Sequence, residues 1–525
     1  MLDRLHHRGP DGHGSRRVGR HWLGHARLSI VDLAGGSQPL ADPHHGRWVV
    51  ANGEIYNHAD LRAQLRGPFR TRSDSEIVLH VLADRGPGGV VDMRGMWAFC
   101  VVGEDGEVVL GRDPLGVKPL YWAHRDGRIL VASELAAFPA EARPDVEEFP
   151  PGHYWTPEEG LVAFVDLHVA PLGADRPARP AYRTREAARG AIRRSMVMAV
   201  RERMMADVPV GVFLSGGLDS SIVAAILARE AAPGDVVRSF AAGTADSTDL
   251  VAARVVAEHL GLEHHERVYT DDEVIEMLPR VVAATESYEP SLIRSAVPNY
   301  LLAELAVRHV KVVLTGEGAD ELFAGYHHLR ELDQEGLRDA LAAGVGSLHH
   351  LNLQRCDRVT MAHGLEARVP FLSREMLDVA QRIPVAWKLL GADGQEKALL
   401  RESFAGWLPE ESCGVARNSS ATGRARPRSW RVVRSPWSRS QAGRRSASRA
   451  CHRRAPVRSS GTSGSSSSTW GASAPSGCSA GSRPRRTRRS GEPARCLSES
   501  GHRARVRDTR EEEMWVFHPV SARPA

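Results

Sequence analysis

From about residue 184 to residue 411 the sequence alternates short apolar segments with helical ones, and a Gly-rich turn joins one such pair. The apolar segment Val208–Leu214 leads into Ser-Gly-Gly-Leu-Asp-Ser at Ser215–Ser220, and a helical pattern follows over Ser220–Ala231. Helices between apolar strands are typical of a parallel sheet, which we expect here. The same alternation predicts strands over Val236–Ala242 and Lys311–Leu314 and a helix over Leu250–Leu260.

The turn at Ser215–Ser220 has the chemistry of an anion site. Two glycines where a strand meets a helix let backbone N–H groups converge on a phosphate, and the helix N-terminus adds partial positive charge. The turn has neither the Gly-Lys-Ser of a Walker A loop nor the spaced glycines of a dinucleotide loop. It resembles the pyrophosphate loop of ATP pyrophosphatases, which activate a carboxylate as an acyl-adenylate. A capped helix start with flexible glycines is the alternative.

A second Gly-rich turn follows the predicted strand Lys311–Leu314. It reads Thr-Gly-Glu-Gly-Ala-Asp-Glu from Thr315 to Glu321, which places Glu317, Asp320 and Glu321 on one short loop. Carboxylates so close together repel one another unless a cation lies among them. With ATP as substrate we expect that cation to be Mg²⁺, whereas the alternative is a solvated, acidic helix cap.

Residues 1–165 have a different pattern, of short strands bounded by Gly, Asp or Asn. One helix is predicted among them, over Asp74–Leu82, because its apolar residues fall on one side. This pattern predicts an α+β domain built on antiparallel sheet, and residues 166–183, rich in Pro, Ala and Arg, form a natural linker. The predicted strands are Trp48–Ala51, Trp97–Val102 and Val108–Leu110.

Residues 412–525 differ from the rest of the chain in composition. They carry 24 Arg, no Lys and six acidic residues, and they show no amphipathic period. Such a segment cannot bury enough apolar area to offset its ordering entropy, so we expect a disordered tail. Because the whole chain has a net charge of only +5, residues 1–411 are acidic.

Four of the six cysteines lie in this tail, and Cys100 and Cys356 have neither metal-ligand spacing nor a disulfide framework. We expect both to be reduced thiols packed in a core. No apolar run approaches the roughly 18 residues of a membrane span. No signal peptide is visible either, so we expect no membrane association and a cytoplasmic location.

These turns and several other motifs resemble the glutamine-hydrolysing asparagine synthetase family. The resemblance implies an N-terminal nucleophile-type glutaminase sandwich over residues 1–165 and an ATP-pyrophosphatase domain with a parallel sheet over residues 184–411. It also implies ATP-dependent amidation of aspartate to asparagine through β-aspartyl-AMP, with glutamine as the nitrogen donor and with Mg²⁺. The motifs are His7–Asp11, Arg27–Ile30, Asn52–Asn57, Ser73–Glu76, Arg112–Tyr121, Ser291–Ser295 and Gly364–Phe371.

By this resemblance, Arg27, Asn52, Glu54 and Asp74 hold glutamine. Arg27 would bind its α-carboxylate, for which a guanidinium fork is suited, and Asp74 would bind its ammonium group. Asn52 and the N–H of Gly53 would form the oxyanion hole. Taken alone, an Asn-Gly pair marks a hairpin turn and an Arg beside a strand is usually a surface charge.

In the second half, the resemblance assigns a nucleotide site, a magnesium site and two catalytic residues. Lys397 would neutralise charge that grows on the α-phosphate, and Glu317 would order the aspartyl intermediate or assist ammonia attack. Arg294 and Arg368 would bind aspartate or pyrophosphate, and Asp219 and Asp320 would hold Mg²⁺. The nucleotide site comprises Leu214, Ser215, Gly216, Gly217, Asp219, Ser220, Ala242, Thr315 and Gly316.

The beginning of the sequence departs from the family pattern. The family's nucleophile is a cysteine at position one, activated by its own α-amine, whereas this sequence begins Met1-Leu2-Asp3. Cys100 is expected mid-strand with no free amine beside it, so it does not replace that nucleophile. Roughly thirty family residues, an opening strand included, have no counterpart, and we expect the glutaminase sheet to lack a strand. We therefore expect no glutaminase activity, and ammonia-dependent synthesis at most.

The tail is interpreted as an out-of-frame product. Codons compatible with Ser412–Gly423 include one set whose shifted frame spells Leu-Trp-Arg-Arg-x-Glu-Gln-Phe-Ser-Asp-Gly, which resembles the family's continuation. A mixture of Arg, Ser, Pro and Gly without Lys is also what a GC-rich gene yields in a wrong frame. Under this interpretation the helices that close the second domain after residue 411 are absent, whereas a genuine basic tail is the alternative.

Two other functions stay open from the sequence. A related adenylating amide ligase, such as a β-lactam synthetase-like or antibiotic-pathway enzyme, shares the Ser215–Ser220 loop. A non-catalytic remnant that binds nucleic acid through the Arg-rich tail is the other, although the tail has scarcely any aromatic residues for base stacking. The expected partners are aspartate, ATP and glutamine or ammonia, without nucleic acid, and a homodimer is compatible with the sequence.

Overall fold

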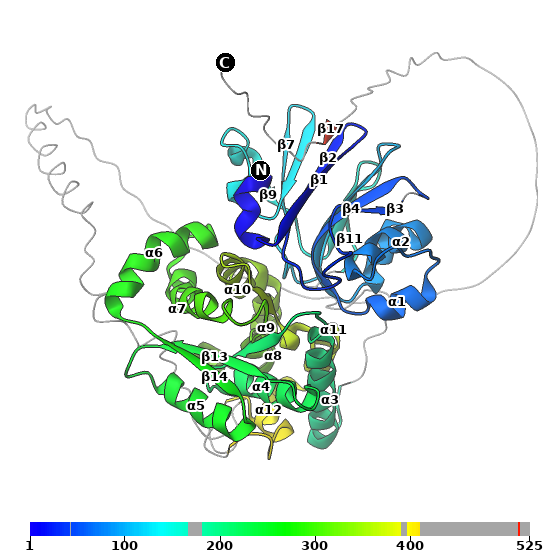
Figure 1. Cartoon of the computed structure of the whole chain (residues 1–525). Helices are drawn as coiled ribbons and strands as arrows, with labels where there is room; N and C mark the ends of the chain where they lie inside the picture. The colour runs from blue at the N-terminus through cyan, green and yellow to red at the C-terminus, as the bar shows by residue number, and fades with distance from the viewer. Residues whose placement is uncertain (43, 166–180, 390–395, 410–512, 515–525) are drawn as a thin grey trace, which may run out of the picture. The chain divides into compact units, whose positions relative to one another are not determined.

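The computed structural model describes residues 1–42, 44–165, 181–389, 396–409 and 513–514. These residues belong to one compact unit (Figure 1). The predicted linker and tail lie outside these ranges, except for residues 181–183 and the two-residue strand β17 (Glu513–Met514), which pairs in parallel with β8.

The first part of the chain is built on antiparallel sheet, as predicted. A six-stranded sheet has the order β11-β10-β6-β5-β4-β3, a second has the order β17-β8-β7-β9, and β1 and β2 form a hairpin. The strands are β1 (Gly12–Val18), β2 (His21–Arg27), β3 (Leu40–Asp42), β4 (Arg47–Ile55), β5 (Gly95–Gly103), β6 (Val108–Arg112), β7 (Tyr121–Arg125), β8 (Arg128–Ala132), β9 (Val146–Glu148), β10 (His153–Thr156) and β11 (Gly160–Ala163).

Strand β5 shows why the six-stranded sheet is buried on both faces. Its side chains alternate between two hydrophobic clusters, because successive residues of a strand point to opposite faces. Trp97, Phe99 and Val101 pack with helix α2 (Ile77–Arg85), whereas Cys100 and Val102 pack with residues of β7 and β8. The predicted helix over Asp74–Leu82 is found as a short 3-10 turn followed by α2.

The second part contains the predicted parallel sheet, with the order β14-β13-β12-β15-β16. Strands β12 and β15 are neighbours near its middle, so the Gly-rich turns that follow them leave the same edge of the sheet. This neighbourhood brings the two predicted ATP loops together. The strands are β12 (Val210–Phe213), β13 (Arg238–Gly243), β14 (Glu263–Val268), β15 (Val312–Leu314) and β16 (Glu366–Arg368).

Helices surround this parallel sheet (Figure 1). Helix α4 follows β12 and contributes a run of fully buried residues, among them Ile222, Val223 and Ile226, to a large hydrophobic core. The helices are α1 (His58–Gln64), α2 as above, α3 (Arg185–Arg203), α4 (Leu218–Glu230), α5 (Thr248–Leu260), α6 (Asp271–Thr285), α7 (Pro290–Ala306), α8 (Ala319–Phe323), α9 (Gln334–Ser347), α10 (Asn352–Met361), α11 (Arg374–Arg382) and α12 (Ala398–Ser403).

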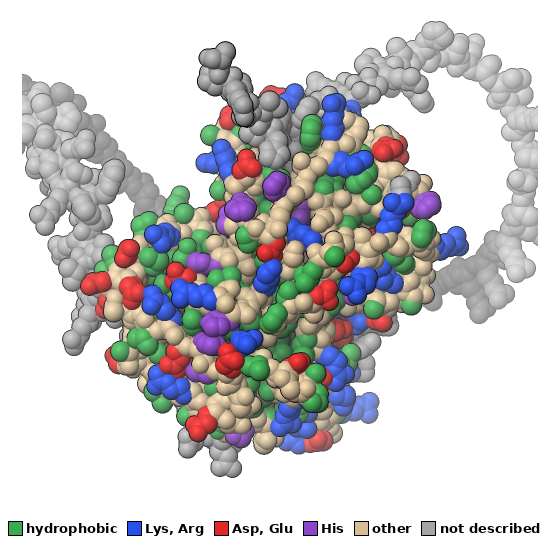
Figure 2. All heavy atoms as spheres, viewed as in Figure 1, with side chains coloured by type: hydrophobic (Ala, Val, Ile, Leu, Met, Phe, Trp, Pro, Cys, Tyr) green, Lys and Arg blue, Asp and Glu red, His purple; other side chains and the backbone are tan. Residues whose placement is uncertain are grey.

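The helices concern the prediction about membranes, and the surface concerns the prediction about nucleic acid. Among the described residues, no helix combines the length and apolar character that crossing a membrane requires. Figure 2 shows basic and acidic side chains interspersed over the face in view. That face of the described residues lacks the continuous basic stripe on which nucleic acids bind.

Candidate active sites

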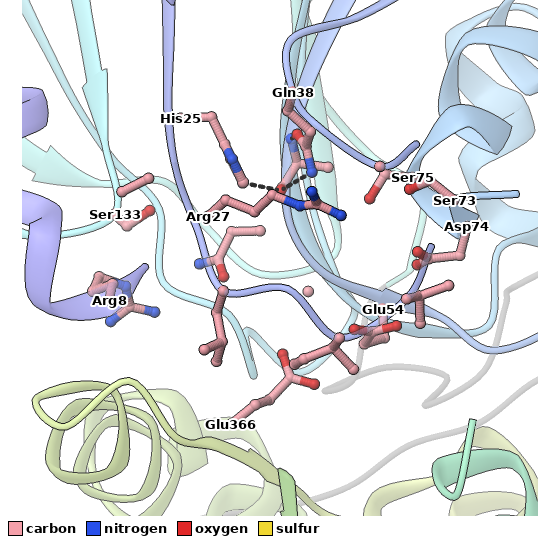
Figure 3. Close-up of a pocket in the computed structure, with 18 of the residues that line it drawn as sticks. Arg8, His25, Arg27, Gln38, Glu54, Ser73, Asp74, Ser75, Ser133 and Glu366 are labelled. Carbon is pink, nitrogen blue, oxygen red and sulfur yellow. Dashed lines mark hydrogen bonds between the residues drawn. The ribbon is translucent and has the colours of Figure 1, made fainter. Parts of the chain in front are cut away.

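A cavity of about 110 Å³ lies beside strands β2 and β4 (Figure 3). The five residues predicted to act on glutamine, namely Arg27, Asn52, Gly53, Glu54 and Asp74, all line it. Seven further polar residues line the cavity, and the sequence did not predict a role for them in glutamine binding. They are Arg8, His25, Gln38, Ser73, Ser75, Ser133 and Glu366.

Two buried carboxyl groups give one end of this cavity its electrostatic character. Burial raises the pKa of Asp74 to about 6, although its Oδ2 accepts a 2.7 Å hydrogen bond from the N–H of Ile55. Burial, together with the nearby charge of Asp74, also raises the pKa of Glu54 well above its usual value. A cationic ligand group between them would relieve both effects, because it favours the ionised carboxylates.

Asn52 offers a hydrogen-bond donor to the cavity, and Gly53 beside it has a backbone conformation that requires glycine. The side-chain Nδ2 of Asn52 is buried and has no hydrogen-bond partner among the described residues, which makes it a ready donor for a ligand oxygen. Gly53 has φ = 120°, and a Cβ atom there would lie 2.0 Å from the carbonyl oxygen of Met96. Only glycine is therefore tolerated beside Asn52 in this strand.

The loop after β2 orients Arg27. Its guanidinium donates to the carbonyl oxygens of Asp32 at 2.7 Å and Leu33 at 3.2 Å, and to Oγ of Ser37 at 3.2 Å. Figure 3 shows the side chain extending across the pocket toward Ser75. A guanidinium fixed in this way is prepared to bind a carboxylate without a further loss of side-chain entropy.

The two described cysteines are buried away from this cavity. Cys100 lies mid-strand in β5 and Cys356 lies in α10, both are free thiols, and neither lines the pocket. Burial raises the pKa of each to about 12. The prediction of reduced, core-packed thiols is confirmed, and neither is an activated nucleophile.

A second cluster lies at the carboxyl edge of the parallel sheet. The Nζ atom of Lys397 lies 2.7 Å from Oδ2 of Asp219 and 2.6 Å from Oδ1 of Asp320. Asp219 belongs to the first predicted loop and Asp320 to the second, and Lys397 is only 2% exposed. The two loops therefore share one buried positive charge.

The turn at Ser215–Ser220 is folded tightly. The hydroxyl of Ser220 accepts from the N–H of Ser215 at 3.2 Å and donates to the carbonyl of Gly217 at 3.1 Å. Gly216 has φ = 73°, and a Cβ atom there would lie 2.5 Å from the backbone of Ala252 in α5. Helix α4 begins within this turn, at Leu218, without a side-chain cap, which leaves its first N–H groups to an anion.

The second turn packs directly on the first. A Cβ atom on Gly316 would lie 2.9 Å from the N atom of Ser220, so glycine permits the close approach. Glu317 forms an ion pair with Arg355 of α10. Thr315 donates its N–H to the carbonyl oxygen of Arg368 at 2.9 Å, which ties β15 to the end of β16.

The remaining predicted residues fall in different places. Leu214 is buried at the end of β12 and donates its N–H to the carbonyl of Phe240, while Ala242 lies near the end of the neighbouring strand β13. Arg294 is exposed in the first turns of α7, and no described contact brings it to Lys397. Its predicted role with aspartate or pyrophosphate stays a prediction.

Arg368 connects the cavity beside β2 and β4 with the two Gly-rich turns. Its guanidinium is fully buried, 3.2 Å from Oε1 of Glu54 and 2.9 Å from Oε1 of Glu366, while its carbonyl holds Thr315. A further buried ion pair joins Glu366 to Lys118 at 3.0 Å. The geometry thus gives Arg368 a structural role between the sites, and its predicted contact with substrate stays a prediction.

Both parts of the chain match protein-family models. A model described as "Glutamine amidotransferase domain" matches residues 1–159, and one described as "Asparagine synthase" matches residues 191–342 and 332–414. The fold and the matches define a glutamine amidotransferase domain followed by a synthase domain with a parallel sheet.

Curated relatives extend the match over most of the chain. Asparagine synthetase B [glutamine-hydrolyzing] of Escherichia coli is 38% identical over 427 residues, 77% of this chain and 75% of that protein. A probable asparagine synthetase of Dictyostelium discoideum is 38% identical over 77% of this chain and 76% of that protein. Asparagine synthetase 2 of Lotus japonicus is 37% identical over 76% of this chain and 70% of that protein. The chain therefore belongs to the glutamine-hydrolysing asparagine synthetase family, as the motifs predicted, and these matches do not favour the related ligases or the nucleic-acid-binding remnant.

Proposed function

We propose that this chain catalyses the ATP-dependent amidation of aspartate to asparagine through a β-aspartyl-AMP intermediate. The observation that carries the proposal is Lys397, whose ammonium group joins Asp219 of the Ser-Gly-Gly turn to Asp320 of the second turn. That junction brings a Gly-rich turn, two acidic residues and a buried cation together at one edge of the sheet. Adenylation of a carboxylate needs these three elements together, because charge must be neutralised on the α-phosphate.

In this proposal the Ser215–Ser220 turn and the N-terminus of α4 bind the phosphates of ATP. Asp219 and Asp320 fit a Mg²⁺ site, because both are carboxylates that already share one cation and because Mg²⁺ prefers oxygen ligands. Bound Mg²⁺ would neutralise phosphate charge. Lys397 stabilises the charge that develops on the α-phosphate. Glu317 of the second turn, held by Arg355, orients the aspartyl group or assists the attack of ammonia.

The cavity beside β2 and β4 is proposed to bind glutamine in the N-terminal nucleophile type of arrangement. Arg27 binds the α-carboxylate, and Asp74 and Glu54 lie at the end suited to the ammonium group. The free Nδ2 of Asn52 serves the oxyanion hole together with the N–H of Gly53. Among the described residues, neither Cys100 nor Cys356 lines this cavity, and we propose that the 525-residue polypeptide uses ammonia and not glutamine.

The test is asparagine formation by the purified 525-residue chain with ATP, Mg²⁺ and aspartate, supplied with either ammonium or glutamine. We expect ammonium to support asparagine formation and glutamine to yield none above the background without a nitrogen donor. A folded preparation that makes no asparagine with ammonium would refute the ligase proposal. Turnover with glutamine would instead refute only the proposed restriction to ammonia.

A further inference from the structure

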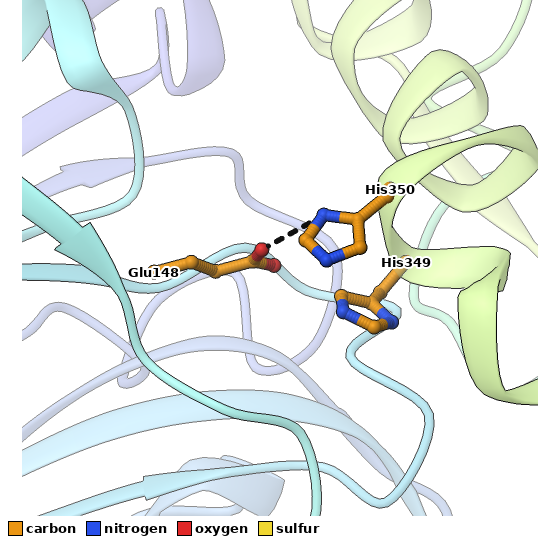
Figure 4. A group of neighbouring side chains, drawn as sticks. All are labelled: Glu148, His349 and His350. Carbon is orange, nitrogen blue, oxygen red and sulfur yellow. Dashed lines mark ion pairs between the residues drawn. The ribbon is translucent and has the colours of Figure 1, made fainter. Parts of the chain in front are cut away.

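A group of metal-ligating side chains lies outside both proposed sites. Glu148 at the end of β9 faces His349 and His350 of a 3-10 turn, η7 (Leu348–His350), and Figure 4 shows the two imidazole rings and the carboxylate converging. One ligand atom from each residue lies within 4.8 Å of the other two. We propose that these three side chains form a binding site for a borderline transition-metal dication, with Zn²⁺ as the representative ion.

The distances suit such an ion. Nδ1 of His350 lies 3.0 Å from Oε2 of Glu148. Two ligands of a tetrahedral zinc, each about 2.0–2.1 Å from the metal, are separated by about 3.3 Å. The third ligand, on His349, is close enough that a small side-chain rotation completes the set, because its ring centroid lies 3.8 Å from that of His350. Two imidazoles and one carboxylate are the protein ligands of an open zinc site.

A neighbouring arginine orients the carboxylate. Arg112 is buried and donates from Nη1 to Oε1 of Glu148 at 2.6 Å and to the carbonyl of Phe149 at 2.6 Å. It therefore fixes one carboxylate oxygen and leaves Oε2 turned toward His350. Ligating carboxylates in metal sites commonly have such an outer hydrogen-bond partner.

Space beside His349 has room for a water molecule. His349 lines a small cavity of about 10 Å³, enough for roughly one water molecule, and Leu353 and Gln354 of α10 lie on its wall. Zinc held by three protein ligands keeps one position for water. The bound ion would link residues of β9 to residues of η7, which are about 200 positions apart in the sequence, so we expect it to stabilise the fold.

The test uses untagged full-length chain, stripped with a chelator and dialysed. Zn²⁺ is titrated in the presence of a competing chromogenic chelator, and metal content is measured after desalting. We expect one zinc per chain at micromolar affinity or tighter, and a higher unfolding temperature with zinc. His350→Ala and Glu148→Gln should each weaken this binding by at least tenfold and abolish the thermal shift.

The chain offers a matched control. Glu263, His265 and His309 form the other group of this kind among the described residues, on the exposed strand β14 and near α7. His309→Ala should leave the tight zinc site unchanged. Because the His350 side chain is 61% exposed, its replacement should not affect folding, which circular dichroism checks.

Two results would overturn the proposal. Binding weaker than 100 µM by the wild-type chain would show that the three side chains do not form a site at useful concentrations. Tight binding that persists in both His350→Ala and Glu148→Gln would place the ion elsewhere, for instance on other histidines of the chain. Cobalt substitution adds a spectroscopic check, because a tetrahedral Co²⁺ site absorbs strongly in the visible region and the two variants should lose that absorption.

Discussion

Lys397 reaches Asp320 from a left-handed backbone conformation, with φ = 53° and with its Nζ 2.6 Å from Oδ1. A non-glycine residue in this conformation costs of order 1–3 kcal/mol and is retained where the surrounding structure requires it. The side chain is buried and also bonds to Asp219 at 2.7 Å. From this strained position a single ammonium group contacts both Gly-rich turns.

Replacing Lys397 tests this arrangement. In Lys397→Met the carboxylates of Asp219 and Asp320 lose their shared cation, and charge on the α-phosphate is no longer neutralised. We expect ammonium-dependent pyrophosphate release to fall by about 10²-fold or more. The matched control is Lys311→Ala, which removes a more exposed lysine paired with Asp11 and should keep activity within a factor of two. A Lys397→Met protein that retains half of the wild-type rate would contradict the assigned role.

Gly216 provides a steric test of the phosphate loop. An alanine there would have an unfavourable φ of 73° and a Cβ atom 2.5 Å from Ala252, so the turn must move away from α5. We expect Gly216→Ala to raise the KM for ATP by roughly five- to thirtyfold, since the strain amounts to roughly 1–2 kcal/mol. Gly88→Ala is the control, because no atom lies within 4 Å of the added Cβ. An unchanged KM in Gly216→Ala would argue that ATP binds elsewhere.

The pKa of Asp74 predicts a pH dependence for glutamine binding. The pKa of Asp74 is about 6 in the folded chain, above the usual value of 3.8, so the folded state retains the proton to higher pH than the unfolded chain. The stability that this group contributes therefore decreases as pH rises from about 4 to about 6. Glutamine needs the ionised carboxylate for its ammonium group, so its affinity should increase about tenfold between pH 5 and pH 7.

Calorimetric titration of glutamine across that pH range measures this effect. In Asp74→Asn the affinity should be weaker and nearly independent of pH, whereas the exposed Asp84→Asn should reproduce the wild-type profile. A wild-type affinity that stays flat from pH 5 to pH 7 would rule out Asp74 as the ammonium ligand.

The buried ion pairs of Arg368 predict that replacing this residue greatly lowers the stability of the fold. Its removal leaves Glu54 and Glu366 buried without their common cation, and breaking a buried pair in this way costs about 3–5 kcal/mol. Urea unfolding of Arg368→Met should show this decrease in the free energy of unfolding. Arg201→Ala, which removes an exposed arginine paired with Glu230, should unfold like the wild type. If Arg368→Met is as stable as Arg201→Ala, the ion pairs of Arg368 with Glu54 and Glu366 do not hold β4 and β16 together.

The sequence predicted the parts of the fold whose signal is local. The apolar strands β12, β13 and β15 and the helices α4 and α5 lie within a few residues of their predicted limits. Strand β16 was not predicted, because its sequence Glu-Ala-Arg has no apolar run. Its charged residues are buried only because their partners, Glu54 and Lys118, come from far along the chain.

Individual site residues are likewise predictable only where the signal is local in the sequence. Lys397 had no local feature that separates it from a surface lysine, and the family resemblance alone selected it. Arg8 was seen only as part of a motif, yet it is buried between Glu134 and Asp357, with bonds of 2.9 Å and 2.8 Å. Such long-range ion pairs leave no periodicity in the sequence, whereas the glycines of the two ATP turns have requirements that can be recognised locally.

We propose that the cluster around Lys397 catalyses transfer of the adenylyl group of ATP to aspartate. The direct measurement is an isotope transfer, with aspartate labelled with ¹⁸O in its β-carboxylate, ATP, Mg²⁺ and ammonium, and with AMP analysed by mass spectrometry. We predict that AMP and pyrophosphate are formed and that one ¹⁸O atom per turnover appears in the phosphoryl group of AMP. Formation of ADP and phosphate, or of AMP without the label, would rule out an aspartyl-AMP intermediate.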